Sequence, residues 1–207
     1  MNISKKYKIA RRLGASIYPK TSTPRFAMVE SKKKANLQKK RKHRSNTTEY
    51  GIQFLEKQKI RYTYGITEKQ LSNYVGKARS GNKGAPADVA YVLLESRLDN
   101  VVYRLGIAGT RQFARQMISH GHIEVNGKRL SIPSYSVKIG DKIGVRDNSK
   151  KSNILVNRME AIKEHNVVNW LHLDKEKLEG SVIATPIVGE RESDLNFGIL
   201  VQFYSRV

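Results

Sequence analysis

Basic and polar side chains recur at helical spacing in residues 110–127, TRQFARQMISHGHIEVNG. Arg111 and Arg115 stand four residues apart and Ser119 four further, which places all three on one face of a helix. Guanidinium groups offer forked donors to phosphate oxygens, whereas hydroxyl and amide groups reach sugars and base edges. The alternative is a solvated face, but residues 101–123 contain no acid to form compensating salt bridges. The pattern therefore predicts contact with RNA.

A second cationic face precedes the first, because Arg97, Asn100 and Arg104 are spaced three and four residues apart. Asp99 lies within an Arg-Leu-Asp triplet, which also marks the catalytic aspartate of some pseudouridine synthases. Those enzymes need a large separate catalytic domain, whereas only about 60 residues follow the predicted hairpins. We therefore expect Asp99 to orient Arg97 or a neighbouring turn, and we expect no enzymatic activity.

His120 and His122 flank Gly121 and raise the question of a metal site. The chain has no cysteine, and no acid lies near the pair before Glu124, so two histidines would make a poor ligand set. RNA contact or capping of a helix C-terminus fits them better. The glycine-rich loop at 78–86 lacks the Gly-Lys-Ser/Thr ending of a phosphate-binding loop. We expect neither a metal nor a cofactor.

Positive charge dominates the composition of the 207-residue chain, which has 39 Lys and Arg residues, 18 Asp and Glu residues and a net charge of +21. Such a surface repels itself and gains from a polyanionic partner, either a nucleic acid or an anionic membrane surface. No apolar run approaches the ~18 residues that would span a bilayer. We expect no membrane partner.

The excess charge is concentrated near the N-terminus. Residues 1–48 hold 15 Lys and Arg residues and one acid, whereas residues 151–207 hold seven basic residues and eight acids. Because residues 1–48 have few apolar side chains, we expect a basic arm that is loosely ordered alone and becomes ordered on RNA. A merely solubilising tail is the alternative. The first 29 residues, which contain no acid, also weakly resemble an organellar transit peptide, but the basic bias continues beyond them.

Helices must position these cationic faces. Residues 50–76 follow a helical pattern in which Thr67 and Gln70 form a capping pair. Apolar residues at three-to-four spacing predict one continuous helix over 88–105, which Gly106 ends. The helix that carries the first cationic face follows directly.

A small sheet is expected after the helices. Thr110 caps the last of them and Gly121 ends it. Asn126-Gly127 favours a type I′ turn, and alternating apolar residues over 135–145 predict a second hairpin. The apolar and aromatic ending at 197–207 must dock on the protein body or on a partner.

Long segments resemble a known family. LESRLDNVVYRLGIAGTRQFARQMISHGHIEVNG at 94–127, with PSYSVKIGDKI at 133–143, resembles the RNA-binding module named after small-subunit ribosomal protein four. That module also occurs in pseudouridine synthases, a tyrosine-tRNA ligase and a heat-shock RNA-binding protein. EYGIQFLEKQKIRYTYGITEKQLSNYV at 49–75 resembles the helical first domain of the ribosomal protein. Its C-terminal part is matched by WLHLD at 170–174, EGSV at 179–182 and LVQFYSR at 200–206. The likeness covers nearly the whole chain and favours the bacterial-type ribosomal family.

The resemblance implies an α+β fold with three parts. Residues 1–48 would form the basic N-terminal arm. Residues 49–92 and 170–207 would form a mainly helical first domain to which the C-terminal segment returns. Residues 93–169 would form an inserted RNA-binding domain, in which two helices pack on a small antiparallel sheet.

The resemblance also implies a function. Members of the family bind small-subunit (16S) ribosomal RNA at a five-helix junction of its 5′ domain and nucleate assembly. They line the channel through which mRNA enters, contact small-subunit proteins five and three, and contribute to decoding accuracy. The chain would then be a non-enzymatic, cytoplasmic component of the small ribosomal subunit. Certain members hold a cysteine-ligated zinc near the N-terminus, so this cysteine-free arm would be held by RNA contacts alone.

We expect two sets of residues to contact RNA. The first set would contact ribosomal RNA, and the second, which rests on the resemblance alone, would contact mRNA. The expected contacts with ribosomal RNA are Arg11, Arg12, Lys57, Lys59, Arg61, Lys69, Arg79, Arg97, Asn100, Arg104, Thr110, Arg111, Gln112, Arg115, Gln116, Ser119, His120, Asn126 and Lys128. The expected contacts with mRNA are Lys39, Lys40, Arg41, Lys42 and Arg44. The alternatives are an RNA-modifying enzyme that uses Asp99 and a free stress or regulatory RNA-binding protein.

Overall fold

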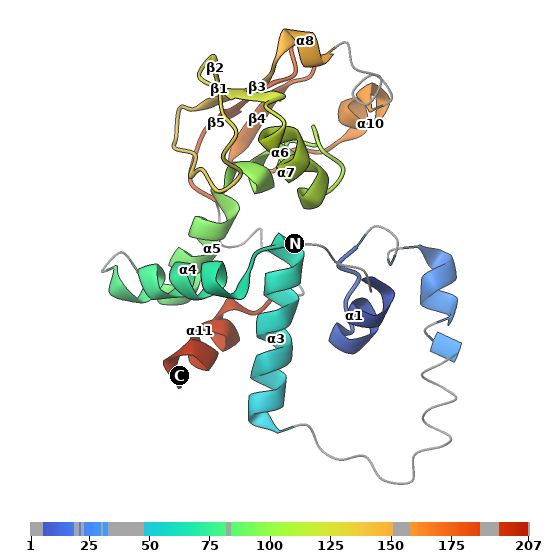
Figure 1. The fold of residues 1–207 in the computed structure, drawn as a ribbon, viewed down its shortest axis with the longest axis vertical. Helices are drawn as coiled ribbons and strands as arrows, with labels where there is room; N and C mark the ends of the chain where they lie inside the picture. The colour runs from blue at the N-terminus through green and yellow to red at the C-terminus, as the bar shows by residue number, and fades with distance from the viewer. Residues whose placement is uncertain are drawn as a thin grey trace. The chain divides into compact units, whose positions relative to one another are not determined.

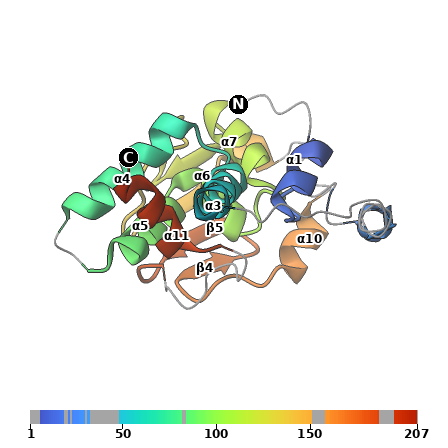
Figure 2. The ribbon, with the colours of Figure 1, turned by 90° about the horizontal axis from the view of Figure 1, so that it is seen from below.

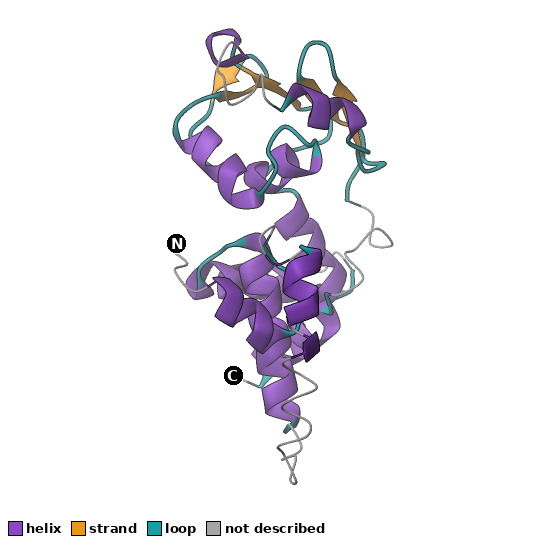
Figure 3. Cartoon of the chain, turned by 90° about the vertical axis from the view of Figure 1, so that its right-hand side faces the viewer, coloured by secondary structure: helices purple, strands orange, loops and turns teal. Residues whose placement is uncertain are grey.

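The computed structural model describes residues 6–18, 21, 23–29, 31–32, 48–81, 84–150, 158–186 and 195–206. The chain divides into two compact units, residues 1–79 with 192–207 and residues 80–191 (Figure 1). The described strands all lie in the second unit (Figure 3). The fold class is α+β, as the sequence predicts.

The first unit is helical and is centred on one long helix. Its elements are α1 (Lys6–Leu13), α3 (Glu49–Tyr64), α4 (Glu68–Ser80) and α11 (Phe197–Ser205). Both α1 and α11 contact α3, and Figure 2, which looks along α3, shows them on opposite sides of it. Tyr64 and Phe197 meet edge to face in the core, with ring centroids 6.5 Å apart. The apolar C-terminal segment therefore docks on the chain's own helical unit.

Local capping explains why residues 50–76 form two helices. Gly65 adopts a left-handed φ of 63°, which ends α3. The Thr67 amide donates to the Gln70 side chain at 3.1 Å, and the Gln70 amide donates to the Thr67 hydroxyl at 3.3 Å. This reciprocal pair starts α4 and confirms the predicted capping box.

Part of the predicted arm folds onto the first unit. Ala10 on α1 is buried, and so are Tyr18 and Thr21. The Thr21 hydroxyl donates to the Tyr18 carbonyl at 2.7 Å and accepts from the Tyr18 amide at 3.1 Å, which locks this turn. The rings of Tyr7 and Phe26 lie 5.6 Å apart. In the described part of the arm, protein contacts hold the chain, so the expectation that RNA contacts alone would hold it is wrong.

The second unit combines short helices with an antiparallel sheet. Its helices are α5 (Pro86–Glu95), α6 (Leu98–Arg104), α7 (Arg111–Ser119), α8 (Asp147–Lys150) and α10 (Met159–Glu164). Its strands are β1 (Ile123–Val125), β2 (Lys128–Arg129), β3 (Lys142–Val145), β4 (Leu171–Asp174) and β5 (Glu179–Val182), in the order β2-β1-β3-β5-β4. One core joins α6, α7 and the sheet through Val102, Ile118, Ile143 and Trp170, which are all essentially inaccessible.

The predicted continuous helix over 88–105 is broken at Arg97, which has an extended backbone with φ −70° and ψ 137°. The amides of Leu98 and Asp99 donate to carbonyl groups of the 133–137 segment at 2.8 and 3.1 Å. These bonds replace the helical ladder at the break. Because the partners come from about 35 residues further along the chain, the local apolar spacing could not reveal them.

One predicted hairpin forms and the other does not. Asn126 and Gly127 have φ of 51° and 74°, the values that a type I′ turn between β1 and β2 requires. Residues 135–139, by contrast, contribute only an isolated bridge between Ser136 and Arg97. β3 pairs with β1 and β5 instead. The second hairpin is therefore wrong, because this segment is used to break the preceding helix.

The predicted domain boundary also differs from the structure. The sequence suggests that residues 170–207 all return to the helical domain, but β4 and β5 complete the sheet of the second unit. Trp170 is 1% exposed and belongs to the core of that unit. Only residues from 192 onward join the first unit. The earlier part stays with the sheet because β5 pairs with β3.

Candidate RNA-binding surface

The region where the sequence predicts RNA contact is organised around two buried carboxylates, those of Glu95 and Asp99. Asp99 accepts hydrogen bonds from Arg97, at 3.0 Å from Nε and 2.9 Å from Nη2. It accepts two more from Arg115, at 3.0 Å from Nε and 2.5 Å from Nη2. The Asp99 carboxylate thus links α6 to α7, and the expectation that it orients Arg97 is confirmed.

Glu95, at the end of α5, organises a second group of side chains. Its carboxylate accepts from Asn100 Nδ2 at 2.8 Å and from Arg104 Nε and Nη2 at 2.9 and 3.0 Å. The Asn100 Oδ1 atom in turn accepts from Arg111 Nε at 2.7 Å. The side chains around the two acids form what we call the carboxylate network: Glu95, Arg97, Asp99, Asn100, Arg104, Arg111 and Arg115.

The carboxylate network shows that the prediction of a cationic face without compensating salt bridges is wrong. Arg97 is 3% exposed and Asn100 is 1% exposed, so neither is accessible for the direct RNA contact that the sequence predicts. Arg104 is also mostly covered, with 14% of its side chain exposed. Salt bridges that the sequence appeared to exclude are present, because both acids lie just before the acid-free stretch of 101–123.

The accessible part of the surface lies along α7. Arg115 keeps 25% of its side chain exposed, and the Arg111 guanidinium lies 4.5 Å from the centroid of the Tyr103 ring. Thr110 serves as the helix cap, since its hydroxyl accepts from the Phe113 amide at 3.0 Å. The exposed residues among those predicted on α7 and at its C-terminus are Gln112, Gln116, Ser119 and His120. They form a polar row beside two fixed guanidinium groups, which suits a sugar–phosphate backbone.

The β1–β2 hairpin extends this surface. Lys128 is exposed, as the sequence predicts. Asn126 instead supports the turn, because its Nδ2 donates to Asp141 at 2.8 Å and its Oδ1 accepts from the Lys142 amide at 2.9 Å. Sequence reasoning missed Arg129, which follows Lys128 on the exposed edge strand. Its adjacency to Lys128 in an accessible hairpin was the available signal.

Near the C-terminus of α7, sequence reasoning considered His120 and His122 but missed Arg146 and Ser149. The Arg146 guanidinium donates to the Gly121 carbonyl at 3.4 Å. The rings of His120 and His122 are nearly parallel, with centroids 6.1 Å apart, and His122 Nδ1 lies 2.9 Å from the Ser149 hydroxyl. Within the described ranges, no three His, Cys, Asp or Glu side chains come together as a metal site.

The predicted contact residues of the first unit differ in their exposure to solvent. Lys57 is buried, donates to Glu68 at 2.8 Å and lies 4.6 Å from the Phe203 ring centroid. Lys59 and Arg61 each keep 17% of their side chains exposed. The exposed ones are Arg11, Arg12, Lys69 and Arg79. The predicted mRNA contacts, Lys39, Lys40, Arg41, Lys42 and Arg44, lie outside the described residues.

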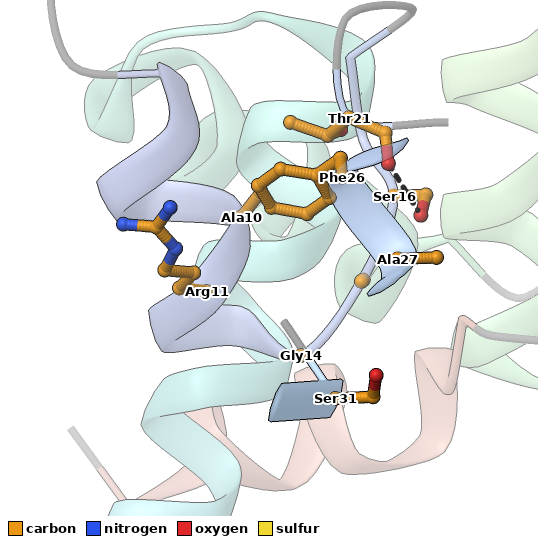
Figure 4. Close-up of a pocket in the computed structure, with 9 residues that line it drawn as sticks. Ala10, Arg11, Gly14, Ser16, Thr21, Phe26, Ala27 and Ser31 are labelled. Carbon is orange, nitrogen blue, oxygen red and sulfur yellow. Dashed lines mark hydrogen bonds between the residues drawn. The ribbon is translucent and has the colours of Figure 1, made fainter. Parts of the chain in front are cut away.

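A pocket of about 270 Å³ lies beside α1, with Arg11 and Phe26 among its lining residues (Figure 4). The Arg11 guanidinium carbon lies 5.7 Å from the Phe26 ring centroid. The hydroxyls of Ser16 and Ser31 donate to backbone carbonyls at 3.2 and 2.9 Å. The Ser16 and Ser31 hydroxyl protons are already donated, and the described residues of the lining include no acid or histidine, so these residues offer no pair of groups for general acid–base chemistry. Among the described helices, none is both long and apolar enough to cross a membrane.

Known sequences match consecutive parts of the chain. The family described as "Ribosomal protein S4/S9 N-terminal domain" matches residues 1–95, and the "S4 domain" family matches residues 96–143. A protein named small ribosomal subunit protein uS4 from Pediococcus pentosaceus is 42% identical over 201 residues, which cover 97% of this chain and 96% of that protein. Its namesake from Alcanivorax borkumensis is 39% identical over 210 residues, or 99% and 98% of the two chains. That from Roseiflexus sp. is 45% identical over 167 residues, or 79% and 80%.

The geometry and the relatives agree on a non-enzymatic protein. Asp99, the residue that the enzyme alternative would require, is 2% exposed and bound by two arginines, so no substrate reaches it. The matched family is one of structural ribosomal proteins. The α+β fold, the accessible face of α7 and the relatives aligned over nearly the full length lead to one conclusion. The chain belongs to the uS4 family of small ribosomal subunit proteins.

Proposed function

We propose that this chain is a structural component of the small ribosomal subunit, acting in translation in the cytoplasm, and that it binds ribosomal RNA through α7 and the β1–β2 hairpin. The observation that carries the proposal is the row of exposed amide and hydroxyl groups beside Arg111 and Arg115. Helical spacing brings these groups to one face, and the α6–α7 packing holds that face rigid. Lys128 and Arg129 extend the positive charge to the edge of the sheet.

The finer proposal is that the RNA site is a five-helix junction of the 5′ domain, where binding nucleates assembly. The net charge of +21 and the family resemblance support an early, primary binder. The basic cluster at 39–44 would line the channel through which mRNA enters, near small-subunit protein three. The first unit would face small-subunit protein five, an interface that would contribute to decoding accuracy. The exposed apolar side chains of Tyr50 and Ile52 on α3 support a protein contact there.

Filter binding tests the RNA site. The purified chain is titrated against the 5′-domain junction RNA and against a random duplex of equal length at moderate salt. Arg111→Ala and Arg115→Ala should each weaken junction binding by roughly 1–3 kcal/mol. Lys177→Ala is the matched control, because it removes one positive charge from an exposed position outside this surface. Equal affinity of the wild-type chain for junction and random duplex would refute the proposal.

A further inference from the structure

Two acids, Glu95 and Asp99, are buried beneath the surface that would bind a polyanion. We propose that Asp99 and Glu95 are positioning residues: they fix the guanidinium groups of Arg115 and Arg111 for RNA phosphates without touching RNA themselves. This inference rests on the proposed function and adds a specific mechanism to it. The arginines would contact RNA, and the carboxylates would orient the guanidinium groups of those arginines.

The Asp99–Arg115 pair supplies the first step. Arg115 donates through Nε and Nη2 to the same carboxylate oxygen, at 3.0 and 2.5 Å, which sets the plane of the guanidinium. Arg97 binds the same carboxylate through two further donors, so Asp99 is itself held in place. Asp99 keeps 2% of its side chain exposed, whereas Arg115 keeps 25%. RNA can therefore meet the guanidinium while the carboxylate stays covered.

Glu95 acts on Arg111 through one intermediate. The Glu95 carboxylate accepts from Asn100 Nδ2 at 2.8 Å, which decides how the amide is turned. The opposite end of that amide, Oδ1, then accepts from Arg111 Nε at 2.7 Å. The Tyr103 ring supports the Arg111 guanidinium at 4.5 Å. Both arginines of α7 are thus oriented by acids that belong to preceding elements of the chain.

Pre-orientation matters because an arginine side chain has many rotamers. An arginine that is free in solution must lose this freedom when it binds phosphate, whereas one held by a buried acid has already lost it on folding. The two guanidinium groups also keep a fixed separation, because the network ties α5, α6 and α7 together. A fixed pair favours one phosphate spacing over others, which predicts selectivity for a folded junction over an ordinary duplex.

Removing a buried acid distinguishes a role in net charge from a role in positioning, because the two roles predict opposite changes in affinity for the junction RNA. Asp99→Asn keeps the side-chain shape and raises the net charge by one. A surface that binds RNA through charge alone would then bind every RNA at least as tightly. The positioning role predicts the reverse for the junction RNA. Asp147→Asn is the matched control, because it makes the same charge change at a side chain that is 91% exposed.

The experiment measures dissociation constants for the 5′-domain junction RNA and for a random duplex of equal length. Asp99→Asn should bind the junction roughly tenfold more weakly, comparable to the loss of one phosphate-directed arginine. Its affinity for the random duplex should match that of Asp147→Asn. Circular dichroism and thermal unfolding establish that each variant is folded. If Asp99→Asn does not fold, Glu95→Gln takes its place and should weaken junction binding without weakening duplex binding.

A double variant separates positioning from general support of the fold. If Asp99 acts through Arg115, then Asp99→Asn should cause no further loss of junction affinity in an Arg115→Ala background. Additive losses would overturn the inference, and so would a folded Asp99→Asn variant that binds the junction as tightly as the wild type. If the wild-type chain itself does not prefer the junction, the proposed function and this inference fail together. Wild-type preference that survives Asp99→Asn overturns the inference alone.

Discussion

Glu68 joins three helices of the first unit through one carboxylate. It accepts from Lys57 of α3 at 2.8 Å and from the Tyr204 hydroxyl of α11 at 2.6 Å. Burial raises the pKa of Glu68, but the hydrogen bonds from Lys57 and Tyr204 outweigh burial, so the pKa lies below its usual value of 4.5. Burial, and then the same hydrogen bond, raise the pKa of Tyr204 above its usual 10.0. An ionised Glu68 therefore contributes to the docking of the C-terminal helix, beside the buried side chains of Phe197 and Phe203.

The pKa of Glu68 gives a prediction with a defined sign. A carboxyl whose pKa is lower in the folded state stabilises the fold above its unfolded pKa and loses this effect as pH falls through the folded value. Glu68→Gln should therefore lower the free energy of unfolding at pH 7, by roughly 0.5–1 kcal/mol because the side chain is partly exposed. The difference from the wild type should shrink as the pH falls below 4.5. Urea denaturation followed by circular dichroism measures it.

Glu160→Gln is the control for Glu68→Gln, because Glu160 is exposed on α10 and the variant makes the same change of charge. It should leave the free energy of unfolding nearly unchanged. An equal effect of the two variants at pH 7, or a Glu68→Gln effect that grows on acidification, would contradict the assigned role.

At the residue scale, the sequence predicted which side chains share the face of α7 but not what holds them. Arg111 and Arg115 lie together because helical spacing is a local property. Their partners, Asn100 and Asp99, lie on another helix, and Glu95 lies on a third. These hydrogen bonds depend on how α5, α6 and α7 pack together, and the spacing of residues within one helix does not predict that packing.

At the element scale, the close approach of the sheet to α6 is a packing constraint. Gly180 on β5 faces Leu105, which follows α6, and a Cβ at position 180 would lie 2.5 Å from Leu105 Cδ1. No side chain fits there without moving Leu105, which is itself fully buried. Gly180 therefore permits the sheet to share one core with α6 and α7.

The variant Gly180→Ala tests this constraint. The added methyl group should overpack the core and lower the free energy of unfolding by about 1–3 kcal/mol. Gly144→Ala on β3 is the matched control, because its added Cβ would meet only the flexible side chain of Glu124, at 3.4 Å or more. Thermal unfolding of both variants gives the comparison. Equal stability of the two variants would show that the sheet and α6 are not in tight contact.

Helix caps and turns that depend on neighbouring residues were predicted correctly, whereas features that depend on distant segments of the chain were not. The caps at Thr67 and Thr110 and the Asn126-Gly127 turn are set by neighbouring residues, and all three formed as predicted. The break at Arg97 and the loss of the second hairpin have one shared cause, the pairing of residues 133–137 with the chain near Arg97. A contact over that separation in sequence leaves no periodic signal, so both errors arose together.

At the scale of the whole molecule, some basic side chains are buried in pairs with acids, and others remain accessible to a binding partner. The net charge of +21 sets a strong general attraction to RNA, but Arg97 and Lys57 are buried and paired with acids. The number of basic residues therefore exceeds the number that can meet phosphates. Composition alone predicted the class of partner, and only the structure separates structural from accessible arginines.

The salt dependence of junction binding measures how many phosphates the accessible residues contact. If about 6–10 phosphates are neutralised, the logarithm of the association constant should fall with the logarithm of salt concentration with a slope of about −5 to −9. Arg115→Ala should make the slope less negative by about 1. A slope near zero would mean that phosphate contacts do not drive binding.

The proposed function requires this chain to be a tightly held component of the small ribosomal subunit. Sucrose-gradient sedimentation of cell extract, before and after a high-salt wash of the ribosomes, measures this association. We expect the chain to migrate with small subunits and to stay with them through the wash. A chain found mainly in the free fractions, or released completely by the salt wash, would contradict it.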